Sequence, residues 1–176
     1  MRTARKRARR SEFLLVAAVL LAALALYMYS HGRAHPEHVY AVVRLERVVD
    51  GDTFWAYGVY GFKMGQSFKV RLSDVDTPER GEPGFWAATR ELNDLLRSAP
   101  CIVLDVDSPP YDRYGRVVAV VYIPYTRDSL LNVNACLLNR HLARAVDFPG
   151  RFHPEDFKTE VPLTPDILNL LRNYCK

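Results

Sequence analysis

The hydrophobic and polar positions divide the chain into one long apolar run near the N-terminus and a series of shorter patterned segments after it. Residues 13–29 (FLLVAAVLLAALALYMY) contain no charged side chain. A helix of this length spans about 26 Å, close to the hydrocarbon core of a bilayer at about 30 Å. The run therefore predicts a transmembrane helix at residues 13–30 that lies in the lipid bilayer.

The charges before this run predict its orientation. The first ten residues hold 6 of the 24 basic residues and no acidic residue, so residues 1–12 form a basic tail. Such tails stay on the cytoplasmic side. We therefore expect a single-pass plasma-membrane protein with a cytoplasmic N-terminus, a linker at residues 31–38 and an extracytoplasmic domain. A cleaved signal peptide and a secreted protein are the alternative, since Gly32-Arg33-Ala34 offers small residues at cleavage positions.

Alternating apolar and polar residues predict five strands after the linker. Residues 39–57 are typical of a strand, an Asp-Gly turn and a second strand. In FKVRLSDV, residues 68–75, every second side chain is apolar at the start, which directs Arg71 away from the face that fills the barrel. Two more strands are predicted at residues 101–108 and 116–124, joined by a polar connection.

Three helices are predicted among and after these strands. Residues 84–100 show an apolar stripe at helical spacing, and residues 129–143 form a second helical segment. The third begins with Thr164 as N-cap and Pro165 at the first helical position. This order predicts an α+β fold, a five-stranded OB-fold barrel with about three packed helices over residues 39–176, preceded by one transmembrane helix.

The net charge of +4 belongs to the tail and not to this domain. Residues 11–176 contain 18 basic and 20 acidic side chains. Any binding of a polyanion by the domain must then come from a local site. The three cysteines, Cys101, Cys136 and Cys175, show no metal-ligand spacing, and both free thiols and one disulfide remain open.

Three short motifs contain carboxylates, and two of them also contain arginines. They are VVDGDT (residues 48–53), RLSDVDTPE (residues 71–79) and DRYGR (residues 112–116). Each alone is also typical of an ordinary turn. Together, in this order, they resemble the staphylococcal nuclease family, whose pattern is Asp-Gly-Asp-Thr, then Arg-x4-Asp-Thr-Pro-Glu, then Asp-x-Tyr-Gly-Arg. The resemblance covers about residues 39–146.

The resemblance implies a role for each motif position. Asp52 and Asp76 would bind a calcium ion with the backbone carbonyl of Thr77, and Asp50 would be an acid close to these ligands. Glu79 would approach the metal through a water and act as general base. Arg71 and Arg116 would grip the scissile phosphate, and a further pair would contact the nucleotide. That pair is Arg113 and Tyr114.

These residue types suit the implied chemistry. Calcium takes six to eight oxygen ligands and accepts water among them. Planar guanidinium groups match phosphate oxygens in a bidentate way that lysine does not. The resemblance thus implies a calcium-dependent endonuclease that hydrolyses DNA and RNA by 5′-O–P cleavage and leaves 3′-phosphate ends. No protein partner is evident from the sequence.

Two other interpretations compete with a nuclease. A catalytically weak OB-fold module, anchored in the membrane, could bind nucleic acid, and a calcium-stabilised barrel could be purely structural. The chain also departs from the family pattern. His141 stands where members often have glycine, which suggests a different local backbone. The loop at residues 80–85 is short, and Phe148 is the nearest aromatic where some members have stacking tyrosines. Asp74 and Arg80 are interpreted as bystanders.

Overall fold

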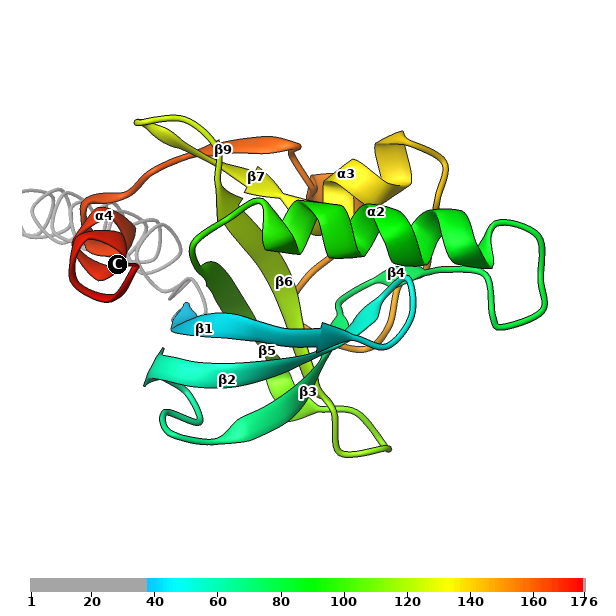
Figure 1. Ribbon diagram of the computed structural model, residues 1–176, viewed down its shortest axis with the longest axis horizontal. Coiled ribbons are helices and arrows are strands. Elements are labelled where there is room, and N and C mark those ends of the chain that lie inside the picture. The colour runs from blue at the N-terminus through cyan, green and yellow to red at the C-terminus, as the bar shows by residue number, and fades with distance from the viewer. Residues whose placement is uncertain (1–37, 176) are drawn as a thin grey trace, which may run out of the picture. The chain divides into compact units, whose positions relative to one another are not determined.

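A closed five-stranded barrel forms the centre of the computed structural model, which describes residues 38–175 (Figure 1). β1 pairs antiparallel with β2 and β5, β2 pairs with β3, and β5 pairs with β6. Parallel pairing of β3 with β6 closes the barrel. The predicted five-stranded barrel of OB-fold type is confirmed. Its strands are β1 (Val39–Val48), β2 (Thr53–Gly61), β3 (Ser67–Leu72), β5 (Ile102–Tyr111) and β6 (Val117–Pro124).

The period-two pattern of the strands builds the core. On β3, Phe68, Val70 and Leu72 are buried in the barrel interior, as the alternation predicts. The Arg71 side chain points away from the barrel interior, as predicted, yet it is also buried, because the segments after β3 cover it. Arg71 is therefore buried outside the barrel interior.

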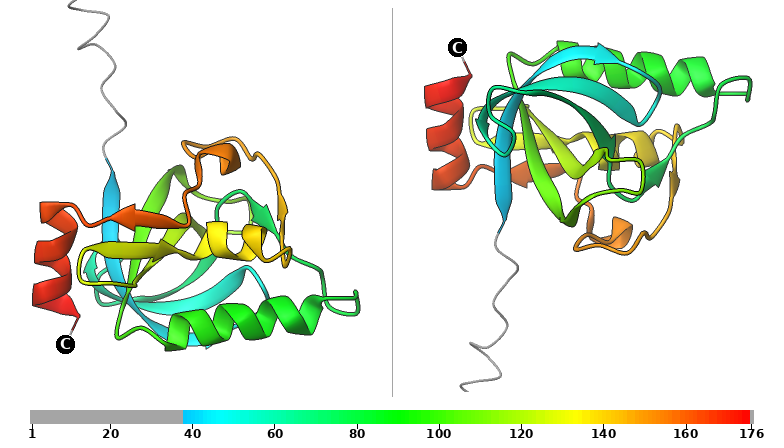
Figure 2. Two further views of the ribbon diagram at one scale, coloured as in Figure 1. Left: turned by 90° about the horizontal axis from the view of Figure 1, so that it is seen from above. Right: turned by 90° about the horizontal axis from the view of Figure 1, so that it is seen from below.

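Three helices pack around the barrel (Figure 2). α2 (Phe85–Arg97) buries Phe85, Ala88, Leu92 and Leu96 along one face. α4 (Pro165–Tyr174) begins as predicted, because the Thr164 hydroxyl accepts a hydrogen bond from the Ile167 N–H. A short 3₁₀ helix, η1 (Pro154–Asp156), precedes α4.

The second predicted helix, residues 129–143, is wrong in its first four and its last four residues. β7 (Ser129–Asn132) is a strand that pairs with β6 and with β9 (Glu160–Pro162). α3 (Val133–Asn139) begins only after Asn132, whose side chain accepts from the Ala135 N–H and so caps the helix. Two short strands, β4 (Val75–Asp76) and β8 (Arg144–Ala145), pair outside the barrel.

His141 ends α3 in a left-handed conformation. Its φ is 56°, its N–H donates to the Leu138 carbonyl, and the Leu142 N–H donates to the Leu137 carbonyl. This is the Schellman arrangement, whose left-handed residue is usually glycine. The expectation of a different backbone at His141 is therefore wrong, because the histidine adopts the geometry that glycine favours.

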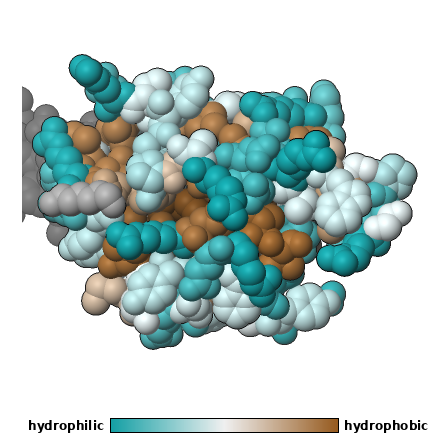
Figure 3. All heavy atoms as spheres, in the orientation of Figure 1, coloured by the Kyte–Doolittle hydropathy of each residue, from teal (hydrophilic) through white to brown (hydrophobic). Residues whose placement is uncertain are grey.

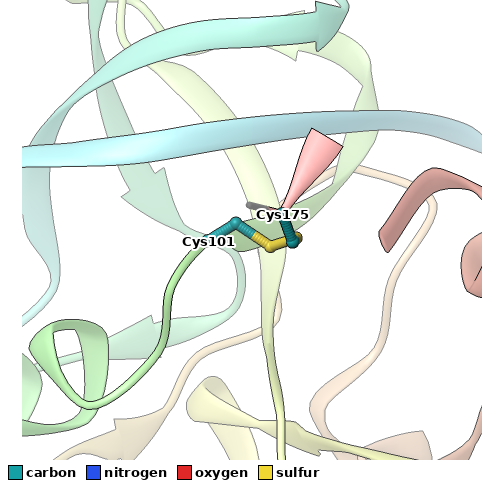
Figure 4. The surroundings of a disulfide bond; sticks show 2 residues. All are labelled: Cys101 and Cys175. Atoms are coloured by element: carbon teal, nitrogen blue, oxygen red, sulfur yellow. A yellow bond between two sulfur atoms is a disulfide. The ribbon is translucent and has the colours of Figure 1, made fainter. Parts of the chain in front are cut away.

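A disulfide joins Cys101 to Cys175 (Figure 4). It connects the start of β5 to the residue that follows α4. Ile167 of α4 packs with Val103 and Leu130, and Tyr174 stacks on Tyr60 with ring centroids 4.4 Å apart. The structure thus decides between the two cysteine alternatives: one disulfide forms, and the third cysteine, at position 136, is free and buried.

Some predictions concern residues that the structure does not describe. The predicted tail at residues 1–12, the anchor at residues 13–30 and nearly all of the linker at residues 31–38 lie outside the described range. Within residues 38–175, no helix has both the length and the apolar character needed to cross a membrane.

Candidate active site

The β1–β2 turn lies tightly against α2 and the segment after β4. A Cβ atom added to Gly51 would lie 2.7 Å from the Ala88 Cβ and 2.7 Å from the Thr77 Oγ1, so only glycine fits here. The turn is also held from within, because the Asp52 N–H donates to Asp50 Oδ1 at 3.2 Å. The close approach carries Asp52 to Thr77, 25 residues later in the chain.

Asp52 is held by contacts from three residues, Thr53, Arg71 and Thr77. Its Oδ2 accepts from the Thr77 N–H at 3.1 Å and the Thr77 hydroxyl at 3.0 Å, and lies 2.9 Å from Arg71 Nη1. Burial raises the pKa of Asp52, Arg71 and Thr77 oppose that rise, and the charge of Asp50 adds to it. A bound cation would favour the ionised form of this carboxylate.

Arg71 joins the two predicted metal-binding carboxylates. It extends from the end of β3, and its Nη2 lies 3.4 Å from Asp76 Oδ1 while its Nη1 faces Asp52. Nη1 also donates to the Val75 carbonyl at 2.7 Å. The guanidinium therefore holds the β1–β2 turn and β4 in one arrangement.

Arg116 reaches the same place from the β5–β6 loop. Asp112 organises that loop, because its Oδ1 accepts from the backbone N–H groups of Tyr114 and Arg116, both at 2.9 Å. Asp112 Oδ2 accepts from Arg116 Nε at 2.6 Å. Burial opposes ionisation of Asp112, but the hydrogen bonds from Arg116 and Tyr114 outweigh it and lower its pKa. The Arg116 Nη1 then donates to the Thr53 hydroxyl at 3.3 Å.

The Thr53 hydroxyl completes a continuous network. It donates to Asp52 Oδ1 at 3.0 Å while it accepts from Arg116. All three sequence motifs thus meet at one end of the barrel, although they lie on separate segments. The connected side chains are Asp76, Arg71, Asp52, Thr53, Arg116 and Asp112.

Glu79 lies in a groove beside this network. The groove has a volume of about 380 Å³, and its walls include Asp76, Thr77, Glu79 and Arg144. The Glu79 backbone N–H donates to Glu82 Oε2 at 2.8 Å. Glu79 is exposed, and among residues 38–175 no hydrogen bond joins its side chain to the network.

Arg113 and Tyr114 stand at the exposed edge of the site. Tyr114 is 67% exposed, and the guanidinium carbons of Arg113 and Arg116 lie 4.7 Å and 5.3 Å from the centre of its ring. The structure thus places this pair next to Arg116, as the motif spacing indicates. Both side chains are accessible to a ligand from solvent.

Arg144 is a site residue that the sequence interpretation missed. Its Nε and Nη2 donate to Asp76 Oδ2 at 2.8 Å and 2.6 Å. It stands on β8, 68 residues after Asp76 in the sequence, and no motif contains it. Only the pairing of β4 with β8 could have revealed it. Thr53 and Asp112 were inside the quoted motifs but received no role.

Asp74 and Arg80, interpreted as bystanders, lie outside the network. Asp74 is buried and accepts from the Phe148 N–H at 2.9 Å, which ties the loop after β8 to β3 and β4. Arg80 is exposed and lies over the Phe85 ring. Phe148 itself is 50% exposed.

The oxygen atoms of the site suit a hard cation. Within residues 38–175, no three His, Cys, Asp or Glu side chains come close enough to hold a metal ion together. The candidate set is instead two carboxylates, Asp52 and Asp76, with the Thr77 carbonyl. Asp52 Oδ1 accepts only from the Thr53 hydroxyl within the described range, which leaves it lone pairs for a cation. Calcium, which accepts carbonyl oxygens and several waters, fits this set.

The site region matches a known sequence family. Residues 69–160 match the family described as "Staphylococcal nuclease homologue". The match contains Arg71, Asp76, Glu79 and Arg116 and begins after Asp52 in the sequence. It covers just over half of the 176 residues.

Individual relatives agree with the family match. The chain is 32% identical over 109 residues to "Micrococcal nuclease" of Shigella flexneri, covering 60% of this chain and 58% of that protein. It is 34% identical over 110 residues to "Thermonuclease" of Staphylococcus intermedius, covering 60% of each. "Protein ParB" of Escherichia coli is 31% identical over 147 residues, covering 81% of this chain and 75% of that protein. The chain thus spans about three-fifths of the length of the two relatives named as nucleases.

Proposed function

The chain belongs to the staphylococcal nuclease homologue family, and from that premise we propose that it is an endonuclease. Its reaction is the calcium-dependent hydrolysis of phosphodiester bonds in DNA and RNA, by 5′-O–P cleavage that leaves 3′-phosphate ends. The observation that carries the proposal is the hydrogen-bonded network from Asp76 through Arg71 and Asp52 to Arg116. It brings two arginines and two carboxylates from distant segments together, and one of them, Asp76, lines the groove.

The arginines supply binding of the phosphate and stabilisation of the transition state. A phosphodiester carries one negative charge and gains another as water attacks phosphorus. Arg71 and Arg116 can both donate to the phosphate oxygens, and their bonds to carboxylates hold the guanidinium groups in place before the substrate binds. Tyr114 and Arg113 are accessible beside them to contact the nucleotide.

Glu79 is the group available to remove a proton from water. It lies in the groove with a carboxylate that makes no hydrogen bond to the network among the described residues. The water oxygen bonds to phosphorus as its proton passes to Glu79, and the bond from phosphorus to the 5′ oxygen breaks. The 5′ oxygen takes a proton from solvent. Calcium, held by Asp52, Asp76 and the Thr77 carbonyl, would neutralise charge on the phosphate and orient water.

Cleavage assays on the full chain in detergent test this proposal. Denatured DNA and RNA are incubated in calcium, in magnesium and in excess chelator, with Glu79→Ala and Arg116→Ala alongside. We expect cleavage in calcium only, and a loss of about 10²-fold or more in each variant. Glu155→Ala, which removes an exposed carboxylate outside the site, is the matched control and should cleave like the wild type.

Two outcomes would contradict the assignment. Wild-type rates in Glu79→Ala, with folding checked by circular dichroism, would remove Glu79 from the mechanism. Strand binding without cleavage in any metal would instead favour the catalytically weak binding module.

We also propose that the domain works outside the cytoplasm, anchored in the plasma membrane by residues 13–30 or released by signal cleavage. The uncharged run after a basic tail supports an export segment. The Cys101–Cys175 disulfide supports an oxidising compartment, since cytosolic thiols are kept reduced.

Protease accessibility in intact spheroplasts distinguishes these locations. With an epitope at each terminus, added protease should digest the C-terminal domain and spare the N-terminal epitope. Recovery of the domain from the medium, without the N-terminal epitope, would indicate signal cleavage. Protection of the domain until the membrane is lysed would contradict the proposed location.

A further inference from the structure

A second groove lies beside α2, near the β1–β2 turn. It has a volume of about 350 Å³ and runs between α2 and the end of β1, which lie side by side in Figure 1. Its walls share no residue with the groove that contains Glu79. Arg47 and Val48 of β1 form one wall, and five α2 side chains form the other: Trp86, Thr89, Arg90, Asn93 and Arg97.

The charge of this groove has one sign. Arg47, Arg90 and Arg97 line it, and no carboxylate does. None of the three forms an ion pair with a carboxylate in residues 38–175, whereas Arg71, Arg116 and Arg144 of the candidate active site are all paired with aspartates. Since residues 11–176 carry more acidic than basic side chains, this local excess does not follow from the overall charge.

An exposed indole adds a flat apolar surface to these charges. Trp86 is 69% exposed, more than any other large apolar side chain in the described domain. Its ring meets the buried Phe85 ring edge-on, with ring centroids 5.0 Å apart. Phe85 therefore supports the indole from one side. Hydrophilic side chains dominate this face of the molecule, with apolar residues gathered mainly near its centre (Figure 3). Arginines beside an exposed aromatic ring are the combination by which proteins bind single-stranded nucleic acid without sequence preference.

The groove and the candidate active site border the same turn. Arg47 lies three residues before Asp50, and Ala88, between Trp86 and Arg90 on α2, is the residue that Gly51 approaches. The 13 residues of α2 extend over about 20 Å, enough for several nucleotides. A strand whose phosphate lies at Arg71 and Arg116 could therefore continue from the turn along α2.

We propose that the groove between α2 and β1 binds a segment of the single-stranded substrate away from the scissile phosphate. Arg47, Arg90 and Arg97 contact phosphates, and Trp86 stacks on a base. The inference deepens the proposed nuclease function and rests on it for the identity of the strand. It explains why α2 presents arginines that form no ion pair within residues 38–175, in a domain that is otherwise near neutral.

Binding measured without cleavage tests the groove. The full chain in detergent is titrated with a fluorescent 24-nucleotide single strand in excess chelator, over a range of salt concentrations. Arg90→Ala/Arg97→Ala should weaken binding about tenfold at low salt and reduce the slope of log K against log salt by about 1.4. Trp86→Ala should weaken binding about fivefold or more, and Trp86→Phe less.

Matched variants remove the same groups elsewhere. Arg127→Ala/Arg172→Ala deletes two exposed arginines that form no ion pair within residues 38–175, and Tyr125→Ala deletes a ring that is 60% exposed. Every variant keeps the basic N-terminal tail, so its contribution cancels. These controls should retain wild-type affinity and salt slope.

The outcomes test the groove proposal independently of the nuclease proposal. Equal affinities of the α2 variants and their controls would overturn the groove proposal, whether or not the protein cleaves DNA. The α2 arginine variant could lose as much affinity for poly-glutamate as for the single strand, while Trp86→Ala leaves nucleic-acid binding unchanged. That result would overturn the groove proposal in favour of a surface that binds acidic protein. Weakened strand binding in a protein that never cleaves would support the groove and refute the nuclease.

Discussion

At the scale of single residues, Arg71 is the side chain on which the site depends. Its guanidinium lies between Asp52 and Asp76 and also donates to the Val75 carbonyl. A lysine would carry its charge on one atom and could not span both carboxylates. The two carboxylates would also repel each other if the guanidinium did not lie between them. The guanidinium therefore prepares the arrangement that a metal ion and a phosphate would enter.

Arg144 offers the first prediction at this scale. It lies with its side chain 78% exposed and donates two hydrogen bonds to Asp76 Oδ2. A positive charge at this carboxylate competes with calcium, so Arg144→Ala should lower the calcium concentration for half-saturation. Because exposed charges are screened by solvent, we expect a change of about two- to fivefold. Isothermal titration calorimetry with calcium in low salt measures this change in affinity.

Two further variants test whether Arg144 acts through its charge. Arg127→Ala removes an exposed positive charge outside the site and should leave the calcium affinity unchanged. Weaker calcium binding in Arg144→Ala would mean that Arg144 chiefly positions Asp76. In that case Arg144→Lys should restore part of the affinity.

At the scale of elements, α3 ends in a turn whose backbone conformation is unfavourable for the residue that adopts it. The Schellman turn requires a left-handed residue at position 141, and its two hydrogen bonds are formed there. Histidine pays about 1 kcal/mol for this conformation, since its Cβ approaches the following carbonyl. The turn leads directly to β8, where Arg144 meets Asp76.

His141→Gly should therefore stabilise the protein. Relief of the left-handed strain outweighs the greater freedom of glycine in the unfolded chain, and we expect about 0.5–1 kcal/mol. Urea denaturation measures the free energy of unfolding. His153→Gly is the matched control, because His153 has φ −135° and should gain nothing. A loss of stability in His141→Gly would show that the imidazole contributes contacts larger than the strain.

The same region shows why the second helix was predicted too long. Leucines in residues 129–143 suit a helix and a buried strand equally, so their pattern does not separate the two. Asn132 decides the boundary by capping α3, and pairing of β7 with β9 depends on residues about 30 positions away. The strands of the barrel and the start of α4 were predictable because their signals, alternation and the Thr-Pro cap, are local.

At the scale of the whole molecule, the site could be predicted only as far as its motifs extend. Each motif contains acids, two of them contain arginines, and the fold brings the three motifs together at one end of the barrel. Contacts made between elements were not predictable in this way. Arg144 depends on the β4–β8 pairing, and the groove along α2 depends on the packing of that helix beside β1.

The disulfide is the other long-range feature, and it joins parts that sit away from the network. Cys101 and Cys175 are 74 residues apart, and no residue of α4 belongs to the candidate active site. Closing a loop of this length removes conformational freedom from the unfolded chain and stabilises a protein by about 4 kcal/mol. Since domains are typically stable by about 5–15 kcal/mol, the reduced protein should remain folded at 25 °C.

Reduction should therefore lower thermal stability while the proposed cleavage activity at 25 °C persists. We expect the Tm, followed by circular dichroism, to fall by about 10–15 °C when reductant is added to the wild type. Cys101→Ala/Cys175→Ala should unfold at this lower temperature with or without reductant. Cys136→Ala, which removes the free buried thiol, should still respond to reductant as the wild type does. An unchanged Tm on reduction would mean that α4 is held by the packing of Ile167 and Tyr174 alone.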